Sequence, residues 1–203
     1  MEVLQGKQAI IDRVKLPFSF DADKLLKEYL ELKLNNFEYY NVIQLRAPAY
    51  IVDASIPVPP PADDYADGSW TDWLDTSELE SSPYIKSIVE AFKEITSVTL
   101  VRLLRLAPHS NVKEHTDPTL GLEIEQSVIR LTIPILQSEK VTFYLNNQPV
   151  PMKRGECWYL KLTDAHRVVN SGDTERVNLT IDMIPNENLR AIIKESQLKL
   201  VDN

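Results

Sequence analysis

His115 and Asp117 stand two positions apart, so one imidazole nitrogen and one carboxylate oxygen can bind the same metal ion. Two ligands do not hold a reactive metal, and a third is needed. Among the three histidines of the chain, His166 is the best placed, because it lies in a short polar segment between two strand-like stretches. Two histidines and one carboxylate leave three positions open on a non-haem Fe(II) ion. The sequence therefore predicts a metal-binding and catalytic centre formed by His115, Asp117 and His166.

Arg176 follows His166 by ten positions and opens another strand-like stretch. A guanidinium offers two parallel donors to a carboxylate, so Arg176 would suit a dicarboxylate co-substrate that lies on the metal. Each residue also has a structural alternative. A histidine can be a hydrogen-bonded core residue, Asp117 before Pro118 can belong to a turn, and Arg176 can face solvent from a strand. The combined spacing favours the metal site.

The segments that carry these residues resemble the aspartyl/asparaginyl β-hydroxylase family of Fe(II)- and 2-oxoglutarate-dependent oxygenases, which includes bacterial proline hydroxylases. The resemblance covers roughly residues 100–183 and is carried by RLLRL (102–106), HTDPT (115–119), IRLTIP (129–134), GECWYL (155–160) and residues 166–182. It implies Fe(II) as the metal, 2-oxoglutarate and O2 as co-substrates, and hydroxylation of a C–H bond coupled to decarboxylation of 2-oxoglutarate. Members named for aspartyl hydroxylation can carry glycine at the position of Asp117. This chain keeps the carboxylate, as the proline hydroxylase-like members do.

Strand periodicity assigns roles to two further residues. The expected strand at 127–136 places Arg130 and Thr132 on one polar face, and the strand at 176–184 places Arg176 on a similar one. Such faces are usually solvated in antiparallel sheets. Downstream of metal ligands, we expect them to line the inside of a barrel while the apolar faces meet helices. Arg130 would then bind the metal-bound end of 2-oxoglutarate or a substrate carboxylate, with Thr132 as a hydrogen-bonding neighbour of the co-substrate.

Arg102 and Arg105 point to opposite faces of the expected strand at 98–106. If the leucine-rich face that carries Arg102 looks inward, its cation needs an anionic partner, and a substrate carboxylate would supply one. Three alternatives stay open. Arg102 can reach the barrel rim, or it can pair with an acid such as Glu114. In the third, the inward face is reversed and Arg105 binds the substrate.

We therefore expect a dioxygenase that hydroxylates a small carboxylate, a free amino acid such as proline or a relative. One alternative is a hydroxylase of Asp or Asn side chains in a protein or peptide. Another is a cupin-like protein that binds a small ligand without oxygenase turnover, because a fold alone does not define a reaction. The position of Arg176 favours the oxygenase.

The composition limits the classes of binding partner and the cellular location that we expect. A net charge of -8 argues against nucleic acid, which needs clustered Lys and Arg. No apolar run is long enough to span a membrane. The single cysteine, Cys157, and a start without signal-peptide character favour a cytoplasmic protein. The sequence does not indicate an oligomeric state.

The 203 residues predict one α+β domain. Short strands with turn signals between them, at 98–106, 127–136, 141–145, 156–160, 167–170 and 176–184, indicate a β-sandwich or jelly roll. The family resemblance implies a cupin-like double-stranded β-helix over residues 97–185. Residues 1–96 form an annex whose helices pack on the outer sheet, and a helix closes the chain at 186–203.

Within the annex, apolar spacing predicts helices at 22–34, capped by Asp21, and at 84–95. A strand is expected at 37–46, with a possible continuation at 50–52, and a turn at 108–111. The long proline-rich loop at 53–82 contains two tryptophans, so we expect it either to fold over the site or to pack on the scaffold.

Overall fold

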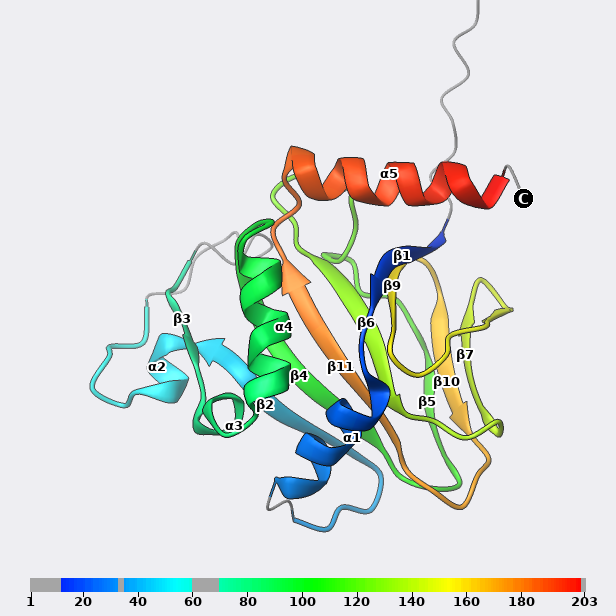
Figure 1. Cartoon of the computed structure of the whole chain (residues 1–203), viewed down its shortest axis with the longest axis horizontal. Helices are drawn as coiled ribbons and strands as arrows, with labels where there is room; N and C mark the ends of the chain where they lie inside the picture. Colours follow the sequence, from blue (N-terminus) through cyan, green and yellow to red (C-terminus); the bar gives the residue numbers. More distant parts are fainter. Residues whose placement is uncertain (1–11, 33–34, 60–69, 202–203) are drawn as a thin grey trace, which may run out of the picture.

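A computed structural model describes residues 12–32, 35–59 and 70–201. Two antiparallel sheets form a jelly roll (Figure 1). The larger sheet has the order β1-β9-β6-β11-β4-β2-β3, and the smaller has the order β5-β10-β7-β8. The larger sheet contains β1 (Arg13–Ser19), β2 (Tyr40–Pro48), β3 (Trp73–Asp75), β4 (Val98–Leu106), β6 (Ile129–Leu136), β9 (Glu156–Leu160) and β11 (Arg176–Met183). The smaller contains β5 (Ser110–His115), β7 (Val141–Leu145), β8 (Gln148–Val150) and β10 (His166–Asn170).

From β4 to β11 the chain passes repeatedly from one sheet to the other, which is the winding of a double-stranded β-helix. Side chains of both sheets meet inside it, and Trp158 of β9 and Leu106 of β4 belong to one apolar cluster with Phe143 of β7 and Val168 of β10. The α+β jelly-roll expectation is confirmed. None of the helices in the described ranges has both the length and the apolar character that spanning a bilayer requires.

Helices cover the outer face of the larger sheet (Figure 1). They are α1 (Ala22–Glu31), α3 (Ser77–Glu80), α4 (Pro83–Lys93) and α5 (Glu187–Val201), while the short α2 (Ala49–Val52) contacts β2 and β3. The main core joins them to the apolar sides of the strands, where Leu131 and Leu179 are fully buried together with Leu25 of α1 and Ile85 of α4. The predicted alternation of β6 and β11 is therefore confirmed on this side.

Local signals explain the helix starts. Asp21 precedes α1, and its side chain accepts hydrogen bonds from the backbone N–H groups of Asp23 and Lys24. Pro83 occupies the start of α4, where a missing N–H costs nothing.

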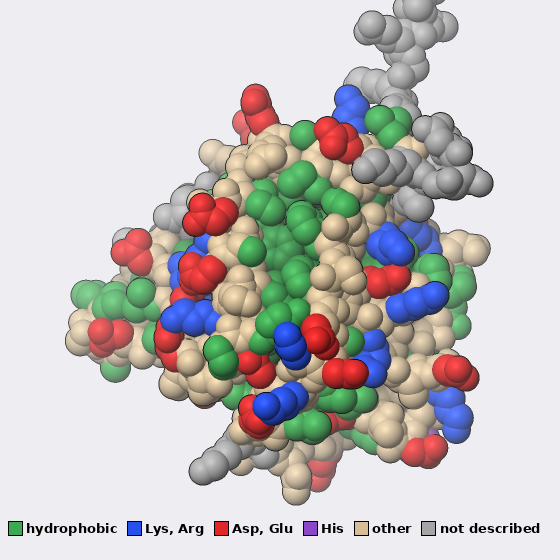
Figure 2. All heavy atoms as spheres, viewed as in Figure 1, with side chains coloured by type: hydrophobic (Ala, Val, Ile, Leu, Met, Phe, Trp, Pro, Cys, Tyr) green, Lys and Arg blue, Asp and Glu red, His purple; other side chains and the backbone are tan. Residues whose placement is uncertain are grey.

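The helix-covered side of the molecule is shown in the space-filling view of Figure 2. Hydrophobic side chains form a strip in the middle of this side, and charged side chains of both signs surround it.

Several local predictions were wrong. Residues 50–52 belong to the short helix α2 and not to a strand, because the chain turns after Pro48 and Asp53 N–H donates to Ala49 O. Ser110 and Asn111, predicted in a turn, begin β5. The described part of loop 53–82 contains β3 and α3, and residues 60–69 lie outside the described residues. The first helix ends at Glu31, and residues 33–34 also lie outside the described part.

Candidate metal centre

Three potential metal ligands meet where β5 and β10 run side by side. His115 is the last residue of β5, His166 is the first of β10, and the two are paired in register. Their ring centroids lie 4.2 Å apart. Asp117 follows β5, and its backbone N–H donates to Leu162 O at 2.8 Å. The nearest ligand atoms of the three side chains all lie within 4.8 Å of one another, so the structure brings together the three predicted residues.

Hydrogen bonds orient both rings. Nδ1 of His115 lies 2.8 Å from Lys113 O, and Nδ1 of His166 lies 3.0 Å from Asp164 O. A carbonyl only accepts, so each Nδ1 carries the hydrogen and each neutral ring keeps a lone pair on Nε2. Burial lowers the pKa of His166, which favours the neutral form that a metal requires. The donor set and its orientation fit a divalent metal ion.

Polar side chains continue from this centre along the inner face of the larger sheet. Thr180 of β11 is paired with Arg102 of β4 on one side and Thr132 of β6 on the other. Directly opposed residues point to the same face of a sheet, so all three face inward. Thr132 and Thr180 are both buried. The predicted polar faces of β6 and β11 thus point into the barrel, where they adjoin the apolar cluster around Trp158.

Arg176 lies farther along the same face and is only 4% exposed. Its Nε has no hydrogen-bond partner in the described structure, and none of the described carboxylates forms an ion pair with it. The amide of Asn178, turned so that its oxygen faces Arg176, accepts one hydrogen bond from the guanidinium. Burial lowers the pKa of Arg176 to about 10. A buried cation with an unsatisfied donor fits an anionic ligand at this point.

Arg130 connects the polar face to the metal ligands. Its Nε and Nη2 donate to the two carboxylate oxygens of Asp182 at 2.7 and 2.8 Å, and its Nη1 lies 3.3 Å from Oδ2 of Asp117. Burial opposes its charge, but these carboxylates outweigh burial and raise the pKa of Arg130. Arg102 is held less completely. Its Nη2 lies 3.6 Å from Asp182 Oδ2, while its Nε and Nη2 make no hydrogen bond.

Arg105 is not brought together with these residues. It lies on the opposite face of β4, where its Nε donates to the Tyr29 hydroxyl at 2.8 Å and its Nη2 lies 3.2 Å from Glu175 Oε2. Its guanidinium also lies 4.0 Å from the centre of the Phe37 ring. Its charge is satisfied on the helix-covered side of the sheet.

Sequence reasoning missed two residues of this face. Asp182 holds both Arg130 and Arg102, and its position at a two-residue period from Arg176 was the signal that could have found it. Tyr40 of β2 is paired with Leu106, whose partner on the other side is Arg176, so all three share the inner face. Tyr40 is 41% exposed, and the burial of the rest of its side chain raises its pKa against the opposing influence of the arginines.

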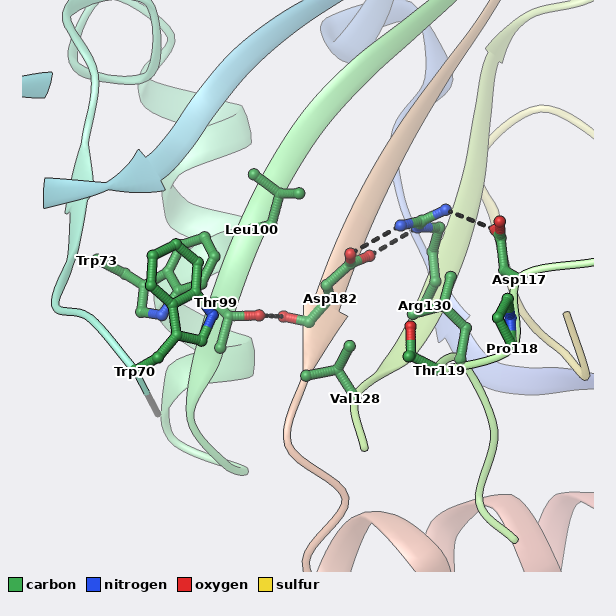
Figure 3. Close-up of a pocket in the computed structure, with 11 residues that line it drawn as sticks. Trp70, Trp73, Thr99, Leu100, Asp117, Pro118, Thr119, Val128, Arg130 and Asp182 are labelled. Atoms are coloured by element: carbon green, nitrogen blue, oxygen red, sulfur yellow. Dashed lines mark hydrogen bonds and ion pairs between the residues drawn. The ribbon is translucent and has the colours of Figure 1, made fainter. Parts of the chain in front are cut away.

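A cavity of about 300 Å³ lies beside Asp117 and Arg130 (Figure 3). Trp70 and Trp73 lie across it from a connected row formed by Asp182, Arg130 and Asp117. The complete lining consists of Trp70, Trp73, Thr99, Leu100, Asp117, Pro118, Thr119, Leu120, Val128, Arg130 and Asp182. The described end of the long loop thus contributes to a cavity next to the metal ligands.

The sequence also matches a known protein family. Residues 67–185 match the family described as aspartyl/asparaginyl beta-hydroxylase. L-proline cis-3-hydroxylase 2 of a Streptomyces species is 29% identical over 110 residues. That match covers 53% of this chain and 37% of the Streptomyces protein, so the chain spans little more than a third of this curated relative.

A solved structure of similar fold is an oxidoreductase of the 2OG-Fe(II) oxygenase family from Burkholderia pseudomallei. It is 13% identical, with a TM-score of 0.52, and the comparison covers 88% of this chain and 87% of that one. At this level of identity, the likeness shows only that the two proteins have similar folds.

Proposed function

Because the chain belongs to the aspartyl/asparaginyl β-hydroxylase family, whose match covers more than half of it, we propose that it is an Fe(II)- and 2-oxoglutarate-dependent hydroxylase. The convergence of His115, Asp117 and His166 is the observation that carries the proposal. These residues would hold the iron. Bound iron would supply the activation of O2 that an unactivated C–H bond requires, while 2-oxoglutarate is converted to succinate and CO2.

Arg176 would bind the distal carboxylate of 2-oxoglutarate. Its burial and its unpartnered Nε support this role, because such a cation is costly without an anion. Thr132 shares the inner face and would add a hydrogen bond to the co-substrate. Arg130 already binds Asp182 and Asp117, so its role would be to hold these carboxylates in place beside the substrate.

The substrate would be a small carboxylate, and a free amino acid such as proline is the form we favour. Arg102 supports this choice because its Nε and Nη2 make no hydrogen bond. Its ion pairing is also incomplete, because Asp182 accepts two hydrogen bonds from Arg130 and Arg102 reaches it only at 3.6 Å. Arg102 therefore has donor groups available for a substrate carboxylate. The name of the Streptomyces relative points to the same class.

Succinate formation tests the activity. Anaerobically loaded protein is mixed with 2-oxoglutarate, air-saturated buffer and single amino acids, and succinate and hydroxylated product are measured. We expect one or more amino acids to stimulate succinate release and to gain one oxygen atom. Stimulation only by Asp- or Asn-containing peptides would support the alternative substrate class. Absence of any 2-oxoglutarate turnover or binding would refute the oxygenase.

A further inference from the structure

We propose that Trp70 and Trp73 form the wall that selects the substrate, and that the substrate is a small carboxylate with an apolar body. An aliphatic or cyclic amino acid fits this description, whereas an aspartyl or asparaginyl side chain does not. The inference rests on the proposed function, because the cavity in question adjoins the same metal ligands.

The cavity has two unlike sides. Asp117, Arg130 and Asp182 form its charged side, next to the metal centre, and Trp70 and Trp73 form the opposite side (Figure 3). Leucine, valine and proline side chains complete the apolar part of the lining. A volume of about 300 Å³ lies at the lower end of the range for ligand pockets, roughly 300–1,000 Å³, and suits a small molecule.

Most polar side chains of the lining are already engaged. Asp182 accepts two hydrogen bonds from Arg130, which also pairs with Asp117, the proposed iron ligand. The Thr99 hydroxyl donates to Asp182 O at 3.2 Å. Thr119 is the remaining hydroxyl of the lining, and the indole N–H groups of the two tryptophans are its other donors. The substrate carboxylate would pair with Arg102, whose Nη2 lies 3.6 Å from Asp182 Oδ2. A second carboxylate would lie beside Asp117 and Asp182, where Arg130 is already engaged, whereas an apolar body would gain contact with the indole rings.

The tryptophan wall is fixed to the scaffold. β3 pairs with β2, which places Trp73 opposite Pro48, and Ala49 N–H donates to Asp72 O at 2.7 Å. Trp70 packs edge-to-face on Trp73 with ring centroids 5.9 Å apart, and Tyr50 lies 6.1 Å from Trp70. A wall held in this way binds a ligand without first having to be ordered, which favours affinity and selectivity.

The test compares Trp73→Ala and Trp70→Ala with Leu74→Ala. Leu74 is the matched control, because it is the next residue of β3, is 38% exposed and is not part of the cavity lining. Succinate release is measured with proline and leucine as apolar probes and with aspartate and asparagine as polar probes. Wild-type protein should respond to an apolar probe, and each tryptophan variant should raise the KM for it by roughly tenfold or more. Trp73→Phe should restore most of the loss, and Leu74→Ala should change KM by less than about twofold.

Calorimetry with Mn(II) and 2-oxoglutarate shows whether a negative result concerns the tryptophan wall or the proposed function itself. If the wild-type protein binds both but responds only to aspartate or asparagine, or if the tryptophan variants keep the wild-type KM, the proposed wall is wrong and the proposed function stands. If the wild-type protein binds neither, the proposed function itself fails. Thermal unfolding of every variant identifies a loss that comes from misfolding, and Trp73→Phe then carries the test.

Discussion

Arg176 is the residue whose environment most clearly calls for a ligand. It is almost fully buried, and none of the described carboxylates pairs with it. Arg105 is similarly buried, but Glu175 and Tyr29 satisfy it. Both arginines are buried, so burial does not distinguish them. Their partners do: Arg105 has the partners of a structural residue, and Arg176 lacks the anion that a ligand would supply.

Arg176→Ala should raise the 2-oxoglutarate requirement with little change in metal affinity. Loss of a charge-assisted pair in a buried site costs about 2 to 4 kcal/mol, roughly thirty- to a thousandfold in binding. Calorimetric titration of the Mn(II) protein with 2-oxoglutarate measures this directly. Arg154→Ala is the control, because Arg154 is paired with exposed Asp23 at the surface. An unchanged titration of Arg176→Ala would remove this residue from the co-substrate site.

Arg102→Ala and Arg105→Ala should have different consequences although both residues lie on β4. Arg102→Ala should weaken the response to the substrate, because the inner face loses its incompletely bonded cation. Arg105→Ala should instead lower the free energy of unfolding by roughly 3 kcal/mol, because it leaves the largely buried Glu175 without a cationic partner. Substrate titration and urea unfolding distinguish the two. If Arg105→Ala abolished substrate binding while Arg102→Ala left it intact, the inner and outer faces would be reversed.

At the scale of elements, strands with strict alternation were predictable and polar strands were not. β4, β7 and β9 were predicted with the observed bounds, because buried residues alternate or run continuously along them. β5 escaped prediction because most of its residues are exposed, so its sequence has no apolar period. β3 was missed because three residues are too few to show one.

Local sequence patterns also predicted only part of the site. Spacing predicted the three metal ligands and Arg176, because these residue types follow one another between recognisable strands. Asp182 lay on a predicted face, but only the strand register shows that it meets Arg130. The cavity beyond them depends on Trp70 and Trp73, which reach it through a long-range pairing of β3 with β2 that no local pattern encodes.

Asp75→Asn should loosen β3 and the tryptophan wall. Asp75 is largely buried and lies within 3.0 Å of Lys93 and close to Arg46. Burial acts to raise the pKa of Asp75, but these two cations outweigh it and hold the pKa below its usual value. Stabilisation from this carboxylate is therefore present above about pH 4, its unfolded pKa, and is lost as the pH falls through the lower folded pKa.

Hydrogen exchange of the segment around β3 checks this prediction. Asp75→Asn should increase exchange there and lower the free energy of unfolding by roughly 1 to 3 kcal/mol at neutral pH. The difference from wild type should shrink at low pH, where Asp75 becomes protonated. Glu78→Gln is a suitable control, because Glu78 lies in the adjacent helix α3 and does not pair with Arg46 or Lys93. A constant difference across the pH range would show that the ion pairs do not hold β3.

At the scale of the whole molecule, one sheet serves two purposes. Strands of the annex and of the β-helix form a single seven-stranded sheet, whose outer face packs on helices and whose inner face carries the polar residues. The helix-covered side supplies most of the core. The side facing the smaller sheet carries Arg102, Arg130 and Arg176, and it is where the proposed metal, co-substrate and substrate would bind. This division explains why the neighbouring arginines of β4 have such different surroundings.

Iron content is the measurement that tests the central claim most directly. Wild-type protein, reconstituted anaerobically with Fe(II) and desalted, should hold one iron per chain, and His115→Ala, Asp117→Ala and His166→Ala should each lose most of it while remaining folded. His109→Ala is the matched control, because the third histidine is exposed and pairs with Asp173 away from the centre, so it should keep the wild-type content. Wild-type iron content in the three ligand variants, or its loss in His109→Ala alone, would contradict the assignment.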